Sequence, residues 1–374
     1  MNTTWRQCTI GDVCDTISNT YNSNAQQVVL INTSDVLEGK VLNHIYIPNE
    51  NLKGQFKKTF EEGDILYSEI RPQNKRYAYI DFAPINYIAS TKLMVIRNKN
   101  IVKSKYLYYF LQSDKIISEL QMLAETRSGT FPQITFNELS KLSIKIPPLP
   151  EQDRIISILD SICKKIDINQ QINDNLEEQA KALFKSWFVD FDRNEWVHCE
   201  LGDITLITAG GDRPSKYTNK KTIECHVPIY SNGIDNEGLY GYTDVAKIHE
   251  ESITISARGT IGYVCLRLEP YVPIVRLISI IPNKKELSAK YLYLWALTQN
   301  ITGTGTTQQQ LTVPIFRKTP ISIPSDTKLK QFNSIADPLF SQIESNKKEN
   351  IKLSTLRDTL LPKLMSGELS VEEV

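Results

Sequence analysis

The sequence lacks a long uncharged apolar run. No stretch of about 18 such residues occurs, which excludes a membrane-spanning helix. Residues 1–13 carry the charged side chains of Arg6 and Asp12 where a secretory signal peptide needs an apolar stretch. We therefore expect a cytoplasmic protein.

Net charge is also absent. The chain has 43 basic and 43 acidic residues, so its formal net charge is +0 and no protein-wide field attracts nucleic acid. Any contact with DNA must come from local patches. The 374 residues, 41% of them hydrophobic, are typical of a globular protein, and a chain of this length predicts two or three domains of about 150 residues.

Cysteines are few and scattered. The six occur at positions 8, 14, 163, 199, 225 and 265, without the close paired spacing of a zinc site or a redox motif. We interpret them as buried or idle thiols.

The usual catalytic motifs are missing too. The sequence has no glycine-rich phosphate loop ending in Lys and Ser or Thr, and no glycine fingerprint of a dinucleotide or methyl-donor fold. Asp35 and the Glu38-Gly39-Lys40 run could begin a metal-dependent nuclease site, but these acids are too close in sequence to lie on separate strands. None of the four histidines has a nucleophile placed near it. We therefore predict no catalytic residue, no metal site and no cofactor in this chain.

A repeat of half-chain length is present instead. Residues 5–13 (WRQCTIGDV) recur as residues 196–204 (WVHCELGDI), with Trp, Cys, Gly and Asp in step. The Lys-Tyr-Leu-Tyr run at 105–108 returns at 290–293, and Gln-Ile-Thr at 133–135 returns as Gln-Leu-Thr at 310–312. The offset falls along the chain, which indicates that the second copy is shortened in its loops while it keeps its landmarks.

Each copy ends in a long helical pattern. Apolar residues follow alternating steps of four and three, as in a coiled-coil seam, from Ile155 to Trp187 and from Phe332 to Leu364. Two asparagines occupy the same two seam positions in each pattern; they are Asn169, Asn173, Asn346 and Asn350. Buried amides on a seam cost stability but fix register, so we predict that the two helices pack together through these amides.

Two prolines interrupt the second pattern. Pro338 stands where the first helix has Ser161, and proline removes a backbone hydrogen bond. We expect a kink or break there, so that the regular helix begins only after Pro338, and a second kink at Pro362.

The segments before each long helix are short β-branched or aromatic runs separated by Asn, Gly and Pro. Predicted strands are 28–31, 65–70, 77–80 and 93–96 in the first copy, and 253–256, 263–268 and 277–281 in the second. Each copy then has one shorter helix, at 105–112 or 290–298. The predicted fold class is mixed α/β (α+β), in the chain order globule, helix, globule, helix.

Basic and amide side chains lie in corresponding loops of the two copies. Arg, Lys and Gln carry donors that match guanine and adenine edges, and loops beside strand ends can present them to a groove. The predicted DNA-contacting residues are Arg71, Lys75, Arg76, Arg127 and Gln133 in the first copy and Arg213, Lys216, Arg258, Gln308 and Gln309 in the second.

Several of these stretches resemble the specificity subunits of type I restriction-modification systems. Residues 176–191 (LEEQAKALFKSWFVDF) and 356–369 (LRDTLLPKLMSGEL) resemble their two spacer-helix signatures, and 147–152 (PPLPEQ) resembles the entrance to the first. Residues 231–234 (SNGI) and 256–262 (SARGTIG) resemble their target-recognition domains. The first copy departs from this pattern, because residues 68–72 (SEIRP) replace the glycine-rich version.

This resemblance implies a non-catalytic reader of DNA. It implies target-recognition domains at 1–150 and 193–325, separated by long antiparallel coiled-coil helices at 151–192 and 326–374 in a pseudo-two-fold circular arrangement. Each domain would read one half of an interrupted double-stranded DNA site. The implied partners are two methyltransferase subunits, which bring S-adenosylmethionine, and restriction subunits that translocate and cut DNA with ATP and Mg.

Two other hypotheses remain open. One is a free-standing methyltransferase or nuclease, which the missing motifs disfavour. The other is a coiled-coil adaptor whose globular domains bind protein instead of DNA. Protection of an interrupted DNA site by the chain and a methyltransferase partner distinguishes all three.

Overall fold

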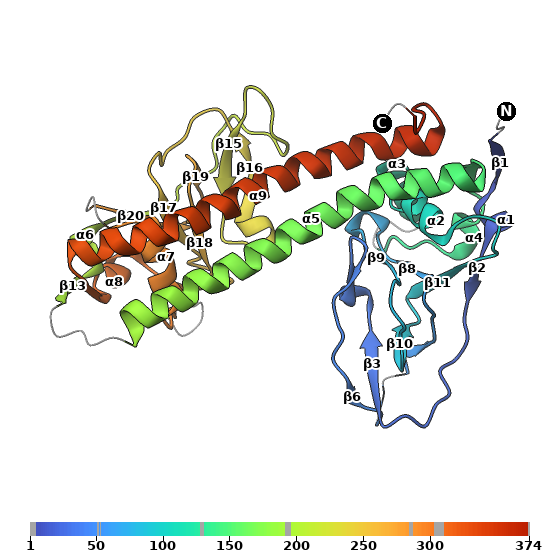
Figure 1. Cartoon of the computed structure of the whole chain (residues 1–374), viewed down its shortest axis with the longest axis horizontal. Helices are drawn as coiled ribbons and strands as arrows, with labels where there is room; N and C mark the ends of the chain where they lie inside the picture. The colour runs from blue at the N-terminus through green and yellow to red at the C-terminus, as the bar shows by residue number, and fades with distance from the viewer. Residues whose placement is uncertain are drawn as a thin grey trace. The chain divides into compact units, whose positions relative to one another are not determined.

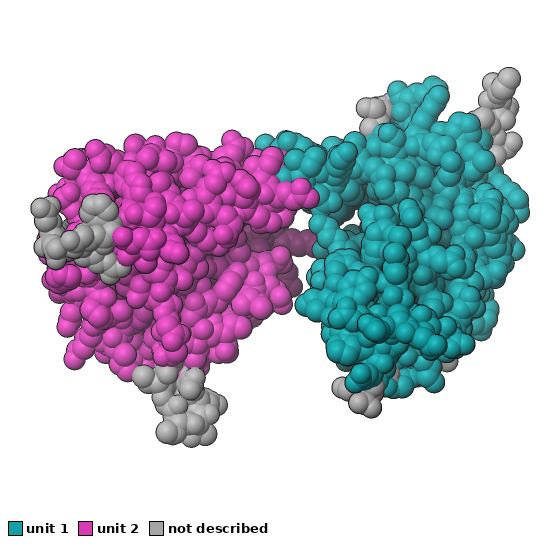
Figure 2. Space-filling model, turned by 60° about the horizontal axis from the view of Figure 1, so that its bottom comes forward, with its two compact units in different colours: residues 1–168, 349–374 teal, residues 169–348 magenta. Residues whose placement is uncertain are grey.

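The computed structural model describes residues 5–50, 52, 54–127, 131–190, 196–283, 287–302 and 310–372, with only the backbone described at Arg127. The chain forms two compact units, which are coloured separately in Figure 2. Unit 1 comprises Met1–Ile168 and Glu349–Val374, and unit 2 comprises Asn169–Lys348. Two long helices are therefore shared, each contributing residues to both units.

Unit 1 is built around an antiparallel sheet of order β2-β11-β8-β9 (Figure 1). Its strands are β2 (Cys14–Ile17), β8 (Ile65–Ser68), β9 (Tyr77–Tyr79) and β11 (Leu93–Asn98). In β11, Met94 and Ile96 face one hydrophobic core while Leu93 and Val95 face another. Because successive side chains point to opposite faces, a strand that is buried on both faces has an unbroken run of apolar residues in its sequence.

A second sheet and a terminal strand pair complete unit 1. The second sheet has the order β6-β3-β10-β7, with β3 (Gln27–Ile31) parallel to β10 (Tyr87–Ser90) and with β6 (Ile47–Pro48) and β7 (Phe56–Lys58) at its edges. Strand β1 (Arg6–Thr9) pairs with β12 (Ser143–Ile146). The remaining short elements are α1 (Ile10–Val13), the β4 (Val36–Leu37) and β5 (Lys40–Val41) hairpin, η1 (Thr33–Asp35), η2 (Pro72–Asn74) and α4 (Phe136–Leu139).

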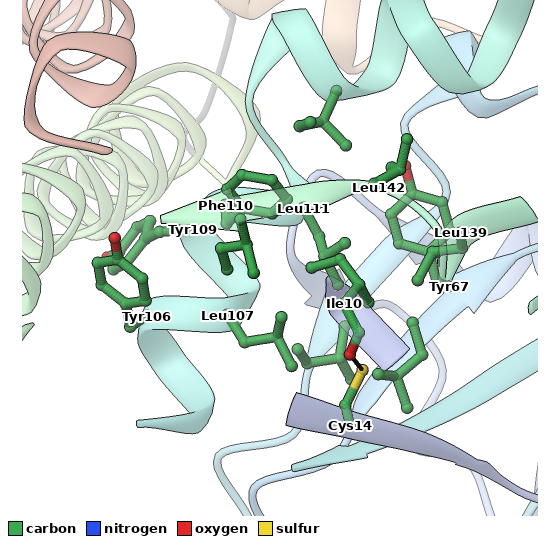
Figure 3. Close-up of a cluster of buried hydrophobic side chains, with 14 of the residues drawn as sticks. Ile10, Cys14, Tyr67, Tyr106, Leu107, Tyr109, Phe110, Leu111, Leu139 and Leu142 are labelled. Carbon is green, nitrogen blue, oxygen red and sulfur yellow. Dashed lines mark hydrogen bonds between the residues drawn. The ribbon is translucent and has the colours of Figure 1, made fainter. Parts of the chain in front are cut away.

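The main core of unit 1 lies between the central sheet and α2 (Ser104–Leu111). Leu107, Phe110 and Leu139 gather with Ile10 in this core (Figure 3). Cys14 is buried beside them, and its thiol donates a hydrogen bond to the carbonyl of Ile10 at 3.3 Å (Figure 3). Burial raises the pKa of Cys14 to about 12, so this thiol is inert, as the sequence predicts.

Unit 2 repeats the topology of the central sheet and of the terminal strand pair, and its second sheet has three strands. Its central sheet has the order β14-β20-β17-β18, its second sheet the order β16-β15-β19, and β13 pairs with β21. The strands are β13 (Val197–Glu200), β14 (Thr205–Ala209), β15 (Val227–Tyr230), β16 (Leu239–Thr243), β17 (Ser252–Ile255), β18 (Val264–Arg267), β19 (Val272–Pro273), β20 (Ile278–Pro282) and β21 (Pro320–Ile323). The helices before the long one are α6 (Leu201–Ile204), η4 (Asp235–Gly238), α7 (Ala289–Leu297) and α8 (Val313–Arg317). The predicted half-chain repeat is confirmed at the level of strand order.

The prediction of one shorter helix per copy is wrong for unit 1. A second helix, α3 (Asp114–Arg127), follows α2 directly. Ile116, Ile117, Leu120 and Ala124 are buried along one of its faces. This spacing of one, four and eight residues from the first position is the helical signal that identifies it.

The long helices are α5 (Leu149–Phe184), which continues into the π-helical turn η3 (Lys185–Val189), and α9 (Asp326–Ser366). In unit 1, Ile155 and Leu159 of α5 share a core with Leu364 of α9. In unit 2, Ala180 of α5 shares a core with Phe332 of α9. An early position on one helix meets a late position on the other in both units, so the helices pack antiparallel within each.

The expected break at Pro338 does not occur. Helix α9 begins at Asp326, well before this proline, and runs on through Pro362. Both prolines are exposed, as are Ser334 and Asp358, the residues four positions earlier whose carbonyls lose their helical partners. Water can therefore bond these carbonyls, which lowers the cost of the lost backbone hydrogen bonds.

The repeated Lys-Tyr-Leu-Tyr run attaches each globule to a long helix. In unit 1, the ammonium of Lys105 on α2 lies 2.6 Å from the Asp160 carboxylate on α5. In unit 2, the ammonium of Lys290 on α7 lies 3.1 Å from the Asp337 carboxylate on α9. The same ion pair thus joins equivalent elements of both units, and it fixes the short helix that covers the central sheet.

Candidate nucleic-acid interface

Three loops of unit 1 meet at Glu69. Its backbone N–H donates to the carbonyl of Lys92 at 3.0 Å, and its carbonyl accepts from the N–H of Ile134 at 2.9 Å. The N–H of Arg71 donates to the carbonyl of Pro132 at 3.1 Å. The loop after β8, the β10–β11 turn and the segment before α4 are therefore joined through the backbone.

These loops bring the side chains of Lys92 and Gln133 into contact beside the backbone of Arg71, and we call these three residues the unit 1 cluster. The ammonium of Lys92 donates to the side-chain oxygen of Gln133 at 3.3 Å and lies 3.8 Å from the Glu69 carboxylate. Arg71 is exposed and has a left-handed backbone, with φ of 44°. Lys58 also holds the turn, because its ammonium donates to the carbonyls of Thr91 and Leu93.

In unit 2, Asn232 joins the corresponding loops. Its side-chain oxygen accepts from the N–H of Ala257 at 2.7 Å, and its side-chain nitrogen donates to the carbonyl of Val275 at 2.7 Å. Its backbone carbonyl accepts from the hydroxyls of Ser256 and Thr260. The SNGI and SARGTIG motifs are thus two halves of one hydrogen-bonded scaffold.

The scaffold of unit 2 also pairs an arginine with a glutamine. The N–H of Leu311 donates to the carbonyl of Ala257 at 3.0 Å. Arg258 then donates from its Nε and from one terminal nitrogen to the side-chain oxygen of Gln310, at 3.2 and 3.1 Å. Gln310 is the repeat equivalent of Gln133, so both units present an amide at the same place beside an arginine-bearing loop.

The other predicted contact residues are engaged elsewhere or lie outside the described residues. Lys75 pairs with Asp114 at 3.3 Å, and Arg76 donates to the carbonyls of Ser34 and Val36. In unit 2, Arg213 lies over the Tyr217 ring at 4.0 Å and donates to the Tyr240 hydroxyl, while Lys216 pairs with Glu224 and Asp244. The side chain of Arg127, together with Gln308 and Gln309, lies outside the described residues.

Sequence reasoning missed Lys92, Asn232 and Gln310. Lys92 joins its cluster only through contacts with residues distant in sequence, so no local pattern marks it. Gln310 could have been found, because the repeat aligns it with Gln133. Asn232 lies in the SNGI motif, but its role depends on Val275, on a different loop.

The seam asparagines lie where α5 and α9 pack within each unit. In unit 2, the side-chain nitrogen of Asn346 donates to the side-chain oxygen of Asn173 at 2.8 Å, and both residues are buried. In unit 1, the side-chain nitrogen of Asn350 donates to the backbone carbonyl of Ile166 at 3.3 Å. Asn169 is also buried.

The described ranges show neither a metal-binding cluster nor a membrane-spanning helix. There, no group of three or more His, Cys, Asp or Glu side chains could hold a metal ion. No helix in the same ranges has the length and apolar character needed to cross a membrane. The carboxylate of Asp35 accepts from the backbone N–H of Asn32 at 2.7 Å and completes the capping box of η1.

Comparison with known proteins places these features in a family. The type I restriction modification DNA specificity domain matches residues 2–178 and 193–355, once for each copy of the repeat. The type I restriction enzyme HindI specificity subunit of Haemophilus influenzae is 33% identical, over 98% of this chain and 99% of that protein. The MjaIX specificity subunit of Methanocaldococcus jannaschii is 29% identical, over 78% of this chain and 77% of that protein.

A solved structure agrees in fold. The crystal structure of a type I restriction-modification system S subunit from M. genitalium superposes with a TM-score of 0.54 at 18% identity, covering 97% of this chain and 96% of that one. The duplicated sheet topology, the two long helices and the double domain match lead to one conclusion. This chain belongs to the family of type I restriction-modification DNA specificity proteins.

Proposed function

We propose that this chain is the non-catalytic DNA-reading subunit of a type I restriction-modification complex. The observation that carries the proposal is the duplicated loop scaffold, which sets an arginine-bearing loop against a glutamine in each unit. Arginine and glutamine are the side chains whose paired donors and acceptors match guanine and adenine edges in the major groove. Family membership supports the same role.

Two readers in one chain suit a bipartite site. The proposed target-recognition domains are residues 1–150 and 193–325, each reading one half of an interrupted sequence. The proposed spacer helices, 151–192 and 326–374, form an antiparallel coiled coil, with the domains in a pseudo-two-fold circular arrangement. The antiparallel packing of α5 and α9 within each unit supports this arrangement.

The proposed DNA contacts are the ten residues predicted from the sequence, with Gln310 added. Arg71, Gln133 and Arg258 have the strongest support, since they lie on the hydrogen-bonded scaffolds. Lys75, Arg76, Arg213 and Lys216 are held by contacts within their own units, so reaching DNA would require them to exchange partners. Arg127, Gln308 and Gln309 are proposed as DNA contacts from the sequence alone. We assign Asn169, Asn173, Asn346 and Asn350 to helix register.

The proposed partners supply the chemistry. Two methyltransferase subunits would bind along the helices and bring S-adenosylmethionine, and restriction subunits would add ATP- and Mg-dependent translocation and cleavage in the cytoplasm. A chain with formal net charge +0 gains little long-range attraction to phosphates. Much of the DNA affinity of the complex would therefore come from those partners.

Footprinting tests the proposal. The chain is co-purified with the methyltransferase subunit of its own host and bound to DNA whose methylated positions have been mapped. We expect protection of an interrupted site, lost when a base changes in either half and kept when a base changes between them. The partner-free chain should transfer no labelled methyl group and cut no DNA. Methyl transfer by the isolated chain, or a complex that ignores base changes in both halves, would refute the proposal.

A further inference from the structure

The turn between β19 and β20 has an unusual backbone. The N–H of Leu277 donates to the carbonyl of Ile274 at 3.0 Å, which closes a four-residue turn. Its two central residues, Val275 and Arg276, have φ of 53° and 61°. Positive φ at both positions is the pattern of a type I′ turn, which strongly favours Asn and Gly. Here a β-branched residue and an arginine occupy it.

The surroundings impose this conformation. The N–H groups of Val275 and Arg276 donate to the carbonyls of Gly211 and Gly210, each at 2.9 Å, and Asn232 donates to the carbonyl of Val275. Gly210 permits the close approach, because a Cβ there would lie 2.7 Å from the backbone nitrogen of Ile274. Strained non-glycine residues that the surrounding structure over-determines are concentrated at functional sites.

Unit 1 carries a basic residue at the same place. Tyr87 and Leu93 flank its turn as Tyr271 and Leu277 flank the turn of unit 2. Each turn leads from the parallel strand of the second sheet, β10 or β19, into an inner strand of the central sheet, β11 or β20. Lys92 therefore corresponds to Arg276. Its backbone has negative φ, so the two units reach the same placement of a cation with different turn geometry.

Both cations project from the scaffolds that carry the arginine and glutamine. The Lys92 carbonyl accepts from Glu69, and its ammonium donates to Gln133. The Arg276 turn is tied through Asn232 to Ala257, the neighbour of Arg258. Arg276 is exposed, and no carboxylate of the described ranges forms an ion pair with it; the nearest acid to Lys92 is Glu69 at 3.8 Å.

We propose that Lys92 and Arg276 are specificity-determining residues, each contacting DNA within the half-site that its own unit reads. The proposal rests on the proposed function above and extends it to a pair of positions. The hydrogen bonds that hold the turn of unit 2 use the backbone groups of Val275 and Arg276 and the side chain of Asn232, so holding the turn does not require the Arg276 guanidinium. A contact between the Arg276 guanidinium and DNA would offset the conformational cost of its positive φ.

The test uses the complex with the methyltransferase and three duplexes: the intact site and the site with either half scrambled. Lys92→Ala and Arg276→Ala are measured by fluorescence anisotropy. Each variant should bind the intact site about 5- to 140-fold more weakly, the equivalent of one lost base contact. Each should also lose affinity on only one of the two half-scrambled duplexes, and the two variants should lose it on opposite ones.

Matched controls come from the repeat itself. Lys141 and Lys318 are exposed, equivalent lysines at the end of α4 and α8, outside both scaffolds, and their alanine variants should bind like the parent. Arg276→Gly guards against misfolding: it relaxes the turn, so it should melt no lower than the parent and still lose affinity as Arg276→Ala does.

Two failures are distinguishable. A parent complex that binds all three duplexes equally would overturn the proposed function itself. A parent that discriminates, with Lys92→Ala and Arg276→Ala matching the Lys141 and Lys318 controls, would overturn only the assignment of these two residues.

Discussion

The side-chain nitrogen of Asn346 donates a 2.8 Å hydrogen bond to the side-chain oxygen of Asn173 between α9 and α5 in unit 2. Asn346 and Asn173 are each only 5% exposed, so water cannot readily replace either partner. Removing one partner of a buried hydrogen bond leaves a polar group unsatisfied, whereas replacing both by apolar groups can be neutral or stabilising.

This pair predicts opposite effects for single and double substitutions. Asn346→Leu alone should lower stability by about 1–3 kcal/mol, because it leaves the Asn173 amide buried without that partner. The double variant Asn173→Leu, Asn346→Leu should recover this loss and melt at or above the parent temperature, with looser register between the helices. Thermal unfolding of all three variants forms the double-mutant cycle. Gln171→Leu on the exposed face of α5 is the control. If the stability losses of the two single variants add up in the double variant, the two amides do not form a shared buried pair.

The repeat explains why so much of the fold could be predicted from the sequence. Strand β11 is apolar on both faces, its equivalent β20 is buried over its first four residues, and the recurring Trp, Cys, Gly and Asp mark the start of each copy. Pro338 was misinterpreted because the penalty of a helical proline depends on which face it occupies, and its exposure becomes visible only in the folded helix.

The candidate site was less predictable for a related reason. Arg71, Gln133 and Arg258 could be selected by residue type and repeat position. Their association with Lys92 depends on backbone hydrogen bonds between loops distant in sequence, which leave no local pattern. The left-handed turn at Val275 runs against its own residue preference, so sequence rules predict a different turn there.

Lys290 predicts a pH-dependent contribution to stability. Its side chain is 12% exposed and lies 3.0 Å from Glu251 and 3.1 Å from Asp337. Burial disfavours its charge, but hydrogen bonds to these carboxylates outweigh burial, and the pKa of Lys290 is raised. A raised pKa of a cation means that the folded state holds the proton more tightly, so the stabilisation is complete below about pH 10.4 and is lost as pH rises through the folded value.

Lys290→Met should therefore lower the free energy of unfolding by about 1–2 kcal/mol at neutral pH. The deficit should shrink above about pH 10.4, where the unfolded parent begins to lose its ammonium, and vanish as the folded parent loses it too at its raised pKa. Chemical denaturation of parent and variant from pH 7 to pH 11 measures this, with the exposed Lys318→Met as the control. A deficit that stays constant across this range would show that packing, not charge, stabilises the contact.

Adjacent glycines should respond differently to the same substitution. A Cβ at Gly210 would lie 2.7 Å from the backbone nitrogen of Ile274, whereas a Cβ at Gly211 would meet only the flexible end of Lys247 at 3.6 Å. Gly210→Ala should destabilise by about 1–3 kcal/mol through forced backbone movement, and Gly211→Ala should be near neutral. Thermal unfolding compares the two variants, and equal melting temperatures would mean that the β19–β20 turn tolerates displacement.

On the proposed function, the length of the first long helix sets the distance between the two half-sites. Helix α5 has 36 residues and is about 54 Å long at ~1.5 Å per residue. If it spaces two DNA readers, four residues inserted after Asn175 add about 6 Å, close to two base pairs at ~3.4 Å each, while unwinding the helix pair only locally. Both half-sequences should stay the same while the unread spacer grows by one or two base pairs. Mapping methylated sites across a genome that carries the insertion measures the spacer directly. Four residues inserted in the exposed loop after Lys220 lengthen the chain without lengthening α5, and that control should keep the parent spacer. A parental spacer in the helix variant as well would show that α5 does not set the distance.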